Sequence, residues 1–256
     1  MRSEIRQFKC LEDNFGLLIH DPRTGATAAI DVPEAAPVLD ELAKTGWNLT
    51  HIFVTHRHKD HIGGIPEVKA RFPQVHVIVP KLEADQIGAH DQAVSDEDQL
   101  ALGSLKVKVL ATPGHTIGHV VYWFPEDKIL FAGDMLFAMG CGRVFETPAA
   151  IMWDSLQKLA ALPTDTQIYC GHEYTLANGR FAVAMEPDNP QLQERMQKVT
   201  ELRQSGAFTL PTTLALELAT NPFLRADQAS IRQSVGLPHA PVADVFAELR
   251  ARKNKF

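Results

Sequence analysis

The sequence has little of what marks a membrane-spanning, secreted or disulfide-bonded protein. None of its apolar runs approaches the roughly 20 residues that a membrane-spanning helix needs. The first residues, Met1 to Arg6, are charged and lack the apolar centre of a signal peptide. The three cysteines, Cys10, Cys141 and Cys170, are scattered and odd in number, which favours free thiols in a reducing compartment. We therefore expect a cytoplasmic protein with no membrane partner.

Basic residues are also fewer than acidic residues. The 256 residues contain 25 Lys and Arg against 31 Asp and Glu, which gives a formal net charge of −6. An acidic chain has no general affinity for phosphate backbones, so we expect no nucleic-acid partner. The hydrophobic fraction of 45% is ordinary for a globular protein with a core. The length suits one large domain, or one domain with a small appendage.

The first two-thirds of the sequence alternate short apolar runs with turn signals. Residues 15–19 and 26–31 flank the turn sequence Asp21–Gly25, which predicts a β-hairpin. Thr147-Pro148 is typical of a helix start, with Thr as the N-cap and Pro at the first helical position. Further strands are expected at 52–54, 75–79, 105–110, 120–124, 129–132 and 167–170, and helices at 38–46 and 64–72.

The character of the sequence changes after about residue 175, where helix formers dominate. A helix is expected from Asn189-Pro190 to about Gly206, and an amphipathic helix from Asp244 to the end. The segment 211–221 is ambiguous. We predict a sheet-based domain over residues 1–174 and a small helical domain over residues 175–256.

The most informative segment is the six residues from His56 to His61. It contains three histidines and one aspartate: His56, His58, Asp60 and His61. An apolar core could not hold so many unpaired polar groups, whereas borderline metals such as zinc bind this mixture of nitrogen and oxygen donors. The preceding apolar run predicts a strand that ends at Thr55. The donors would then lie at the carboxyl end of a strand, where open α/β sheets place their sites.

Three later positions repeat the pattern of an apolar strand followed by glycine and a potential ligand: His115, Asp134 and His172. With the first segment they make five histidines and two aspartates, too many for one tetrahedral ion, which takes four ligands. The set suits two ions that share a carboxylate, and Asp134 is the best candidate for the bridge. His119, four residues beyond His115, is expected to pack against the site or support it rather than bind metal.

The order of these residues resembles the metallo-β-lactamase superfamily: His56-x-His58-x-Asp60-His61, then Gly63-Gly64, His115, Asp134 and His172. Four further motifs resemble the glyoxalase II, or hydroxyacylglutathione hydrolase, family: Gly140–Arg143, Cys170–Thr175, Asn221–Arg225 and Lys253–Phe256. The resemblance covers essentially the whole chain. It implies an α/β (α+β) fold, a metallo-β-lactamase-like αββα sandwich with a small C-terminal all-α domain.

The resemblance also implies a role for each site residue. One metal ion would be bound by His56, His58 and His115, the other by Asp60, His61 and His172, with Asp134 bridging the two. Zinc is the expected metal, with iron or manganese as alternatives. The glutathione part of a substrate would be bound by Arg250 and Lys253, and Tyr174 would line the thioester sulfur and the cysteinyl region. Arg143 and Phe145 complete the implied substrate-binding set. Arg143 and Phe145 stand where eukaryotic members usually carry Lys and Tyr, so the charge is kept and a hydroxyl is lost.

The basic end of the chain supports part of this assignment without the resemblance. The last residues carry four cations in an acidic protein: Arg250, Arg252, Lys253 and Lys255. Cations favour the last turn of any helix, which is one interpretation. The other is capture of carboxylates, which Arg binds in a bidentate manner, and glutathione carries two of them.

The implied function is hydrolysis of S-(2-hydroxyacyl)glutathione, typically S-D-lactoylglutathione, to glutathione and D-lactate by a monomer, the second step of methylglyoxal detoxification. A hydroxide held by the two metal ions would attack the thioester, with Asp60 and Asp134 as catalytic ligands. The alternatives are a lactonase or another thioesterase on the same fold, a mononuclear-iron persulfide dioxygenase, or a non-catalytic metal-binding module. The complete ligand set and the helical tail argue against them.

Overall fold

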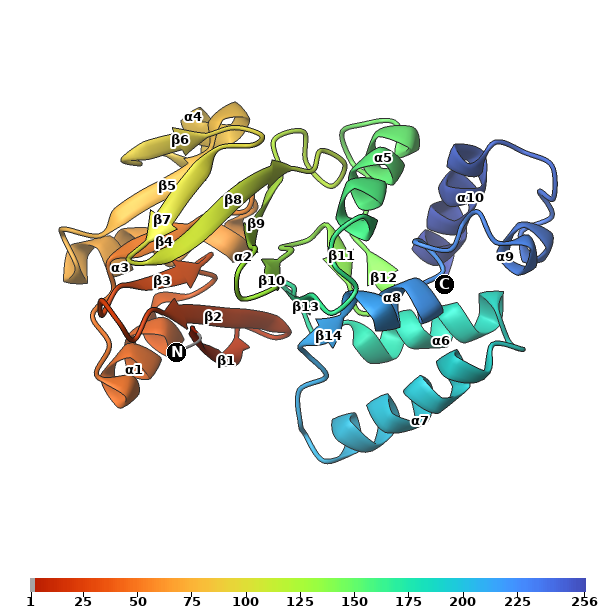
Figure 1. Cartoon of the computed structure of the whole chain (residues 1–256), viewed down its shortest axis with the longest axis horizontal. Coiled ribbons are helices and arrows are strands. Elements are labelled where there is room, and N and C mark those ends of the chain that lie inside the picture. The colour runs from red at the N-terminus through yellow and green to blue at the C-terminus, as the bar shows by residue number, and fades with distance from the viewer. Residues whose placement is uncertain (1–2) are drawn as a thin grey trace. The chain divides into compact units, whose positions relative to one another are not determined.

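The computed structural model describes residues 3–256 and separates into two compact units (Figure 1). The first unit comprises residues 3–111 and 118–133, and the second comprises residues 112–117 and 134–256. The predicted boundary after residue 174 lies inside the second unit, and as a domain boundary it stays a prediction.

The first unit contains a mixed six-stranded sheet in the order β1-β2-β3-β4-β5-β6. Its first three strands are antiparallel and the rest are parallel. The predicted hairpin is confirmed, with Leu17 opposite Ile30. The strands are β1 (Glu4–Cys10), β2 (Asn14–His20), β3 (Thr27–Ile30), β4 (His51–Phe53), β5 (His76–Pro80) and β6 (Gln92–Val94).

Helices cover one face of this sheet. Val38 and Leu42 on one helix and Val68 on another are buried in a single cluster with Ile52 and Val77 of the sheet. This packing fixes the chain on both sides of β4, where the histidine-rich segment begins. The helical elements are α1 (Ala35–Thr45), α2 (Lys59–Ile62), α3 (Ile65–Arg71), the 3-10 turn η1 (Lys81–Glu83) and α4 (Ala84–Ile87).

A second group of strands in the first unit packs on the other face of the sheet. These strands form an antiparallel meander: β7 (Gln99–Leu102), β8 (Leu105–Ala111), β9 (Val120–Phe124) and β10 (Ile129–Phe131). The Tyr122 ring of β9 stacks on Phe53 of β4 at a centroid distance of 5.0 Å. The Tyr122 hydroxyl donates to the Val54 carbonyl at 2.8 Å. The first unit is therefore a sheet-on-sheet sandwich with a buried aromatic core.

The second unit is mainly helical. Helix α6 packs against α7, and α5 packs against α10 through Trp153 and Phe246, whose ring centroids are 5.9 Å apart. The Asn189 side chain caps α7 by accepting from Leu192 N at 3.2 Å, as the Asn-Pro sequence predicts. The elements are β11 (Leu136–Phe137), β12 (Gly140–Cys141), α5 (Ala149–Ala160), β13 (Gln167–Tyr169), α6 (Thr175–Met185), α7 (Pro190–Gln204), β14 (Thr212–Thr213), α8 (Leu214–Thr220), α9 (Ala229–Ser234) and α10 (Val242–Lys255).

Several elements differ from the sequence expectations, and two of the differences have a clear reason. Pro148, not Thr147, is the N-cap of α5, and the Thr147 hydroxyl donates to the Gly114 carbonyl at 3.3 Å instead of capping the helix. Strand β1 was not predicted, because most of its side chains are exposed or half-buried and form no apolar run. Among residues 3–256, no helix combines the length and the apolar character needed to cross a membrane.

Candidate metal centre

The His56–His61 segment, called the ligand loop below, starts at a fixed point. Thr55, directly after β4, donates its backbone N–H and its hydroxyl to the two carboxylate oxygens of Asp31, both at 2.7 Å. The Thr55 carbonyl accepts from Val120 N at 3.0 Å. The loop therefore leaves the strand from a residue whose backbone and side chain are both held.

The donor atoms of the ligand loop face one another. Nε2 of His56 and Nδ1 of His58 are 3.0 Å apart, and the ring centroids of His56 and His61 are 4.1 Å apart. His61 Nε2 lies 3.7 Å from the Asp60 carboxylate. Two imidazole nitrogens on one tetrahedral zinc ion, each at roughly 2.0–2.1 Å, would lie about 3.3 Å apart. The spacing and chemistry of these donors fit a divalent metal ion.

Asp31 orients one of these histidines. His61 Nδ1 lies 2.8 Å from the Asp31 carboxylate, and both side chains are buried. An imidazole that donates Nδ1–H to a carboxylate presents its Nε2 lone pair, which is the usual arrangement of a metal-binding histidine. The backbone of Asp31 has a φ of 56°, which is uncommon for a residue other than glycine. Such departures often occur at functional sites.

Asp31 and Asn14 are site residues that the sequence analysis missed. Asn14 donates from its side chain to the backbone carbonyl of Asp60 at 3.0 Å and to its carboxylate at 3.2 Å. A signal for Asp31 was available, because it follows an apolar strand in the same way as the predicted ligands do. A single asparagine such as Asn14 offers no comparable signal.

The second unit brings its own three predicted ligands together around one carboxylate. Oδ2 of Asp134 lies 3.5 Å from Nε2 of His115 and 3.3 Å from Nε2 of His172. All three side chains are buried. His115 Nδ1 lies 2.9 Å from the Arg143 carbonyl, so that Nε2 faces the carboxylate. A carboxylate between two imidazole lone pairs is an arrangement that a cation would stabilise.

The segment after Asp134 approaches these ligands closely. A Cβ atom on Gly142 would lie 2.0 Å from the Asp134 carbonyl oxygen, so only glycine fits there. The same segment is held by Asn221, whose side chain donates to the carbonyls of Phe137 at 3.2 Å and Gly140 at 2.9 Å. The Glu217 carboxylate accepts from Met139 N at 2.8 Å. Asn221, the first residue of the Asn221–Arg225 motif, thus supports the backbone next to the candidate ligands.

Aromatic rings flank the histidines of the second unit. Tyr174 stacks on His172 at 4.6 Å with an interplanar angle of 5°, and Phe145 lies against His115 at 5.4 Å. Phe145 is 58% exposed and Tyr174 36% exposed, so part of each side chain lies at the surface. These two residues were predicted to contact the substrate, and both lie beside a candidate metal ligand.

Three of the predicted cations, Arg143, Arg250 and Lys253, interact in the second unit, whereas Arg252 bonds to Glu248 and to the Ser234 and Val235 carbonyls. The pKa of Lys253 is lowered by burial and by the charges of Arg250 and Arg143. Arg250 is only 7% exposed, donates Nη1 to the Cys141 carbonyl at 2.9 Å and lies 4.9 Å from the centroid of the Phe223 ring. Two guanidinium groups that act on one ammonium group favour binding of an anion. Arg250 additionally tethers α10 to β12.

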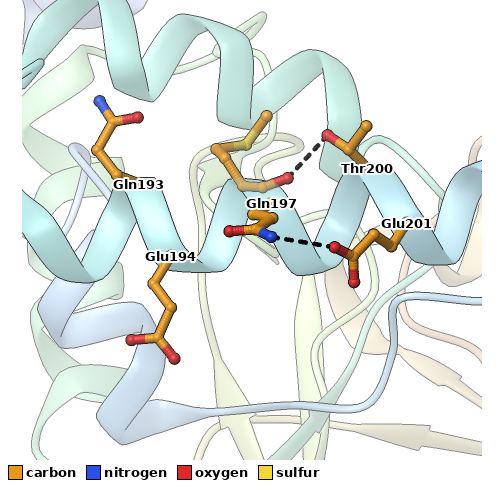
Figure 2. Close-up of a pocket in the computed structure, with 6 residues that line it drawn as sticks. Gln193, Glu194, Gln197, Thr200 and Glu201 are labelled. Carbon is orange, nitrogen blue, oxygen red and sulfur yellow. Dashed lines mark hydrogen bonds between the residues drawn. The ribbon is translucent and has the colours of Figure 1, made fainter.

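Two other features carry no such chemistry. Burial raises the pKa of the Cys10 thiol to about 12 and that of Cys141 to about 11, so these sulfurs stay protonated. A hollow along α7, shown in Figure 2, is lined by side chains of that one helix, two of which, Gln197 and Glu201, bond to each other at 3.2 Å. His119 packs against His56 with ring centroids 5.0 Å apart.

Comparison with known families agrees with this geometry. The family model described as "Metallo-beta-lactamase superfamily" matches residues 16–172, and that described as "Hydroxyacylglutathione hydrolase C-terminus" matches residues 173–256. A protein named hydroxyacylglutathione hydrolase from Rhodopseudomonas palustris (strain BisA53) is 54% identical over 255 residues, which cover 100% of both chains. The chain belongs to the hydroxyacylglutathione hydrolase family. A second family member, from Rhizobium johnstonii, is 51% identical and covers 99% of this chain and 98% of its own.

Solved structures extend the likeness to the fold. The BLEG-1 B3 metallo-beta-lactamase superposes with a TM-score of 0.67 at 20% identity and covers 86% of this chain and 99% of that one. ETHE1 from Myxococcus xanthus gives a TM-score of 0.67 at 26% identity and covers 98% of both chains. The predicted metallo-β-lactamase-like fold with a C-terminal family-specific region is confirmed. His/Asp clusters on this fold suit divalent metal ions.

Proposed function

We propose that this protein hydrolyses the thioester bond of S-(2-hydroxyacyl)glutathione, with S-D-lactoylglutathione as the typical substrate and glutathione and D-lactate as products. The support is the full-length similarity to family members that carry the name hydroxyacylglutathione hydrolase. The family-specific C-terminal match adds to it. The active species is proposed to be a monomer.

The metal centre is proposed to be binuclear. One ion would be held by His56, His58 and His115, the second by Asp60, His61 and His172, with Asp134 as a ligand of both. Zinc is proposed first, and iron and manganese are compatible with the same donors. When bound, such ions polarise a carbonyl and lower the pKa of water to about 7, which supplies a nucleophile at neutral pH.

The observation that carries the proposed metal centre is the position of the Asp134 carboxylate between His115 and His172. The carbonyl of Arg143 faces the other ring nitrogen of His115. Neither a structural ion pair nor a turn aspartate needs two buried imidazoles around one oxygen. This arrangement belongs to the same segment that carries the substrate-binding candidate Arg143, so metal site and substrate site would be joined by a few residues of backbone.

The protein's own residues bind and orient the substrate. Arg143, Arg250 and Lys253 form the cationic cluster proposed to hold the glutathione carboxylates, since guanidinium groups bind carboxylates strongly. Tyr174 would line the thioester sulfur, and Phe145 would contact the glutathione part. Asp60, oriented by Asn14, would align the attacking oxygen. A thiol with a pKa of about 8.5 leaves without a general acid, so no further acid is required.

The test follows hydrolysis of S-D-lactoylglutathione by its ultraviolet absorbance, before and after treatment with a chelator. Fast turnover that chelation abolishes and added zinc restores is expected. The variants Arg250→Ala and Lys253→Ala should raise KM more than they lower kcat, because they remove binding of a part of the substrate that does not react. No turnover by the metal-loaded enzyme would contradict the proposal and direct the search to lactones and other thioesters.

A further inference from the structure

Glu83 is a buried carboxylate that none of the proposed roles uses. It lies at the end of η1 and is 1% exposed. Its oxygens accept three hydrogen bonds: from Arg57 N at 2.7 Å, from Arg57 Nη1 at 3.1 Å and from Gly118 N at 3.0 Å. All of these residues belong to the first unit.

A buried carboxylate is a costly way to stabilise a fold. Removing its charge from water is unfavourable, and a well-packed apolar side chain often serves stability equally well. Glu83 instead orients the backbone, because its two oxygens hold the segments of Arg57 and Gly118 at the same time. A Cβ atom on Gly118 would lie 2.5 Å from Cγ of Glu83, so the contact also requires glycine at that position.

The contact is made at the centre of the ligand loop. Arg57 lies between His56 and His58, whose facing nitrogens are 3.0 Å apart. The start of the loop is held by Asp31 through Thr55, and its end by Asn14 through Asp60 and by Asp31 through His61. Glu83 holds the residue between the first two histidines, through both its backbone and its side chain.

We propose that Glu83 is a positioning residue of the metal centre: by holding Arg57, it keeps His56 and His58 at the spacing that one metal ion requires. This inference rests on the proposed metal-dependent function. A backbone N–H hydrogen-bonded to a carboxylate is a strong, charge-assisted contact, so the peptide planes on either side of Arg57 are constrained with it. Loss of the carboxylate would leave both imidazoles on a less constrained backbone. The affinity for the metal ion that they share would then fall.

The deciding variant is Glu83→Gln, which keeps the side-chain volume and removes the charge. The matched control is Glu186→Gln in the second unit. Glu186 is also buried and accepts from Arg225 Nη2 at 2.7 Å and from Ser230 Oγ at 2.6 Å, and those partners lie outside the candidate ligand segments. Zinc-loaded proteins are titrated with a competing chelator, and the visible spectra of the cobalt-substituted proteins are compared.

We expect Glu83→Gln to bind one zinc equivalent about 10-fold more weakly or worse, the usual effect of losing a partner that orients a metal ligand. Its cobalt spectrum should change. Glu186→Gln should retain zinc as the parent does, even if its thermal midpoint falls. Zinc affinity and cobalt spectrum equal to those of the parent in folded Glu83→Gln would overturn the inference.

A second variant keeps the test decisive if Glu83→Gln does not fold. Glu83→Asp retains the charge but withdraws it by one methylene, and a measurable loss of zinc affinity is expected; unchanged affinity would overturn the inference. A parent protein that takes up no zinc or hydrolyses no thioester would contradict the proposed function itself. A parent that does both, with a Glu83 variant that retains zinc, would contradict only the role of Glu83.

Discussion

The two units hold their candidate ligands in different ways. In the first unit four candidate ligands come from six consecutive residues, and carboxylates outside the loop hold the loop: Asp31 through His61 and Glu83 through Arg57. In the second unit three ligands come from widely separated segments. Their orientation comes from a backbone carbonyl on His115 and an aromatic ring stacked on His172.

This contrast has a physical reason. A short loop has little secondary structure of its own, so charge-assisted hydrogen bonds must replace the missing backbone ladder. Ligands at the ends of separate elements are held by the packing of those elements, and neutral contacts suffice. We therefore expect the first unit's ligands to be sensitive to loss of charge and the second unit's ligands to be sensitive to loss of packing.

The largest effect should come from removing a ligand in either unit. Asp134→Ala and His58→Ala are each expected to lower kcat/KM by about 10³-fold or more, because the ions supply both nucleophile and electrostatic stabilisation. If the two sets serve one centre, the double variant should be no worse than either single variant, since groups that act as a unit are not additive. Losses that multiply in the double variant would mean that the units work independently.

The next effect tests the charged support in the first unit. Asp31→Asn should weaken metal binding by about 10- to 100-fold, because the neutral amide cannot serve both Thr55 and His61 as the carboxylate does. Chelator competition measures this change. Asp21→Asn is the matched control, since Asp21 is equally buried in the first unit and bonds to Ser104 and Thr24 instead. If the control lost metal to the same degree, general destabilisation would explain both.

These supports mark the limit of what the sequence predicted. The ligand loop was visible because its donors are adjacent, and the strands that carry His115, Asp134 and His172 were visible as apolar runs before glycine. The resemblance then linked the tail motifs to substrate binding. Glu83 was not predictable, because it lies 26 residues from Arg57 in the sequence and only the fold brings them within hydrogen-bond distance. Thr147 was wrongly expected to cap α5, because the helix begins at Ala149 and Pro148 takes the N-cap position.

A smaller effect tests the neutral support in the second unit. Asn221→Ala should destabilise the fold by about 2–4 kcal/mol, because it leaves the carbonyls of Phe137 and Gly140 buried without this donor. Asn178→Ala is a graded comparison, since Asn178 donates to one carbonyl of the same segment, that of Ala138 at 3.2 Å. Denaturant unfolding should give Asn221→Ala a lower free energy of unfolding than Asn178→Ala. The reverse order would show that packing, not these hydrogen bonds, holds the segment.

The smallest effect concerns pH and the cationic cluster of the second unit. Burial and the neighbouring charges of Arg250 and Arg143 lower the pKa of Lys253 from its ordinary value of 10.5, so this ammonium loses its proton at a lower pH than a free lysine. Between the folded and the unfolded pKa the unfolded chain binds more protons, so this group makes stability rise with pH in that window. Affinity for an anion should instead fall as the pH rises, because Lys253 loses its positive charge.

KM for the glutathione thioester should therefore increase as the pH rises through the lowered pKa of Lys253, with kcat little changed. Lys253→Arg keeps its charge throughout that range, because guanidinium does not deprotonate in proteins, and its KM should stay flat. Steady-state kinetics of both proteins across the alkaline range measure the difference. Parallel KM profiles would remove Lys253 from the binding site and leave its charge the ordinary role of a cation in the last turn of a helix.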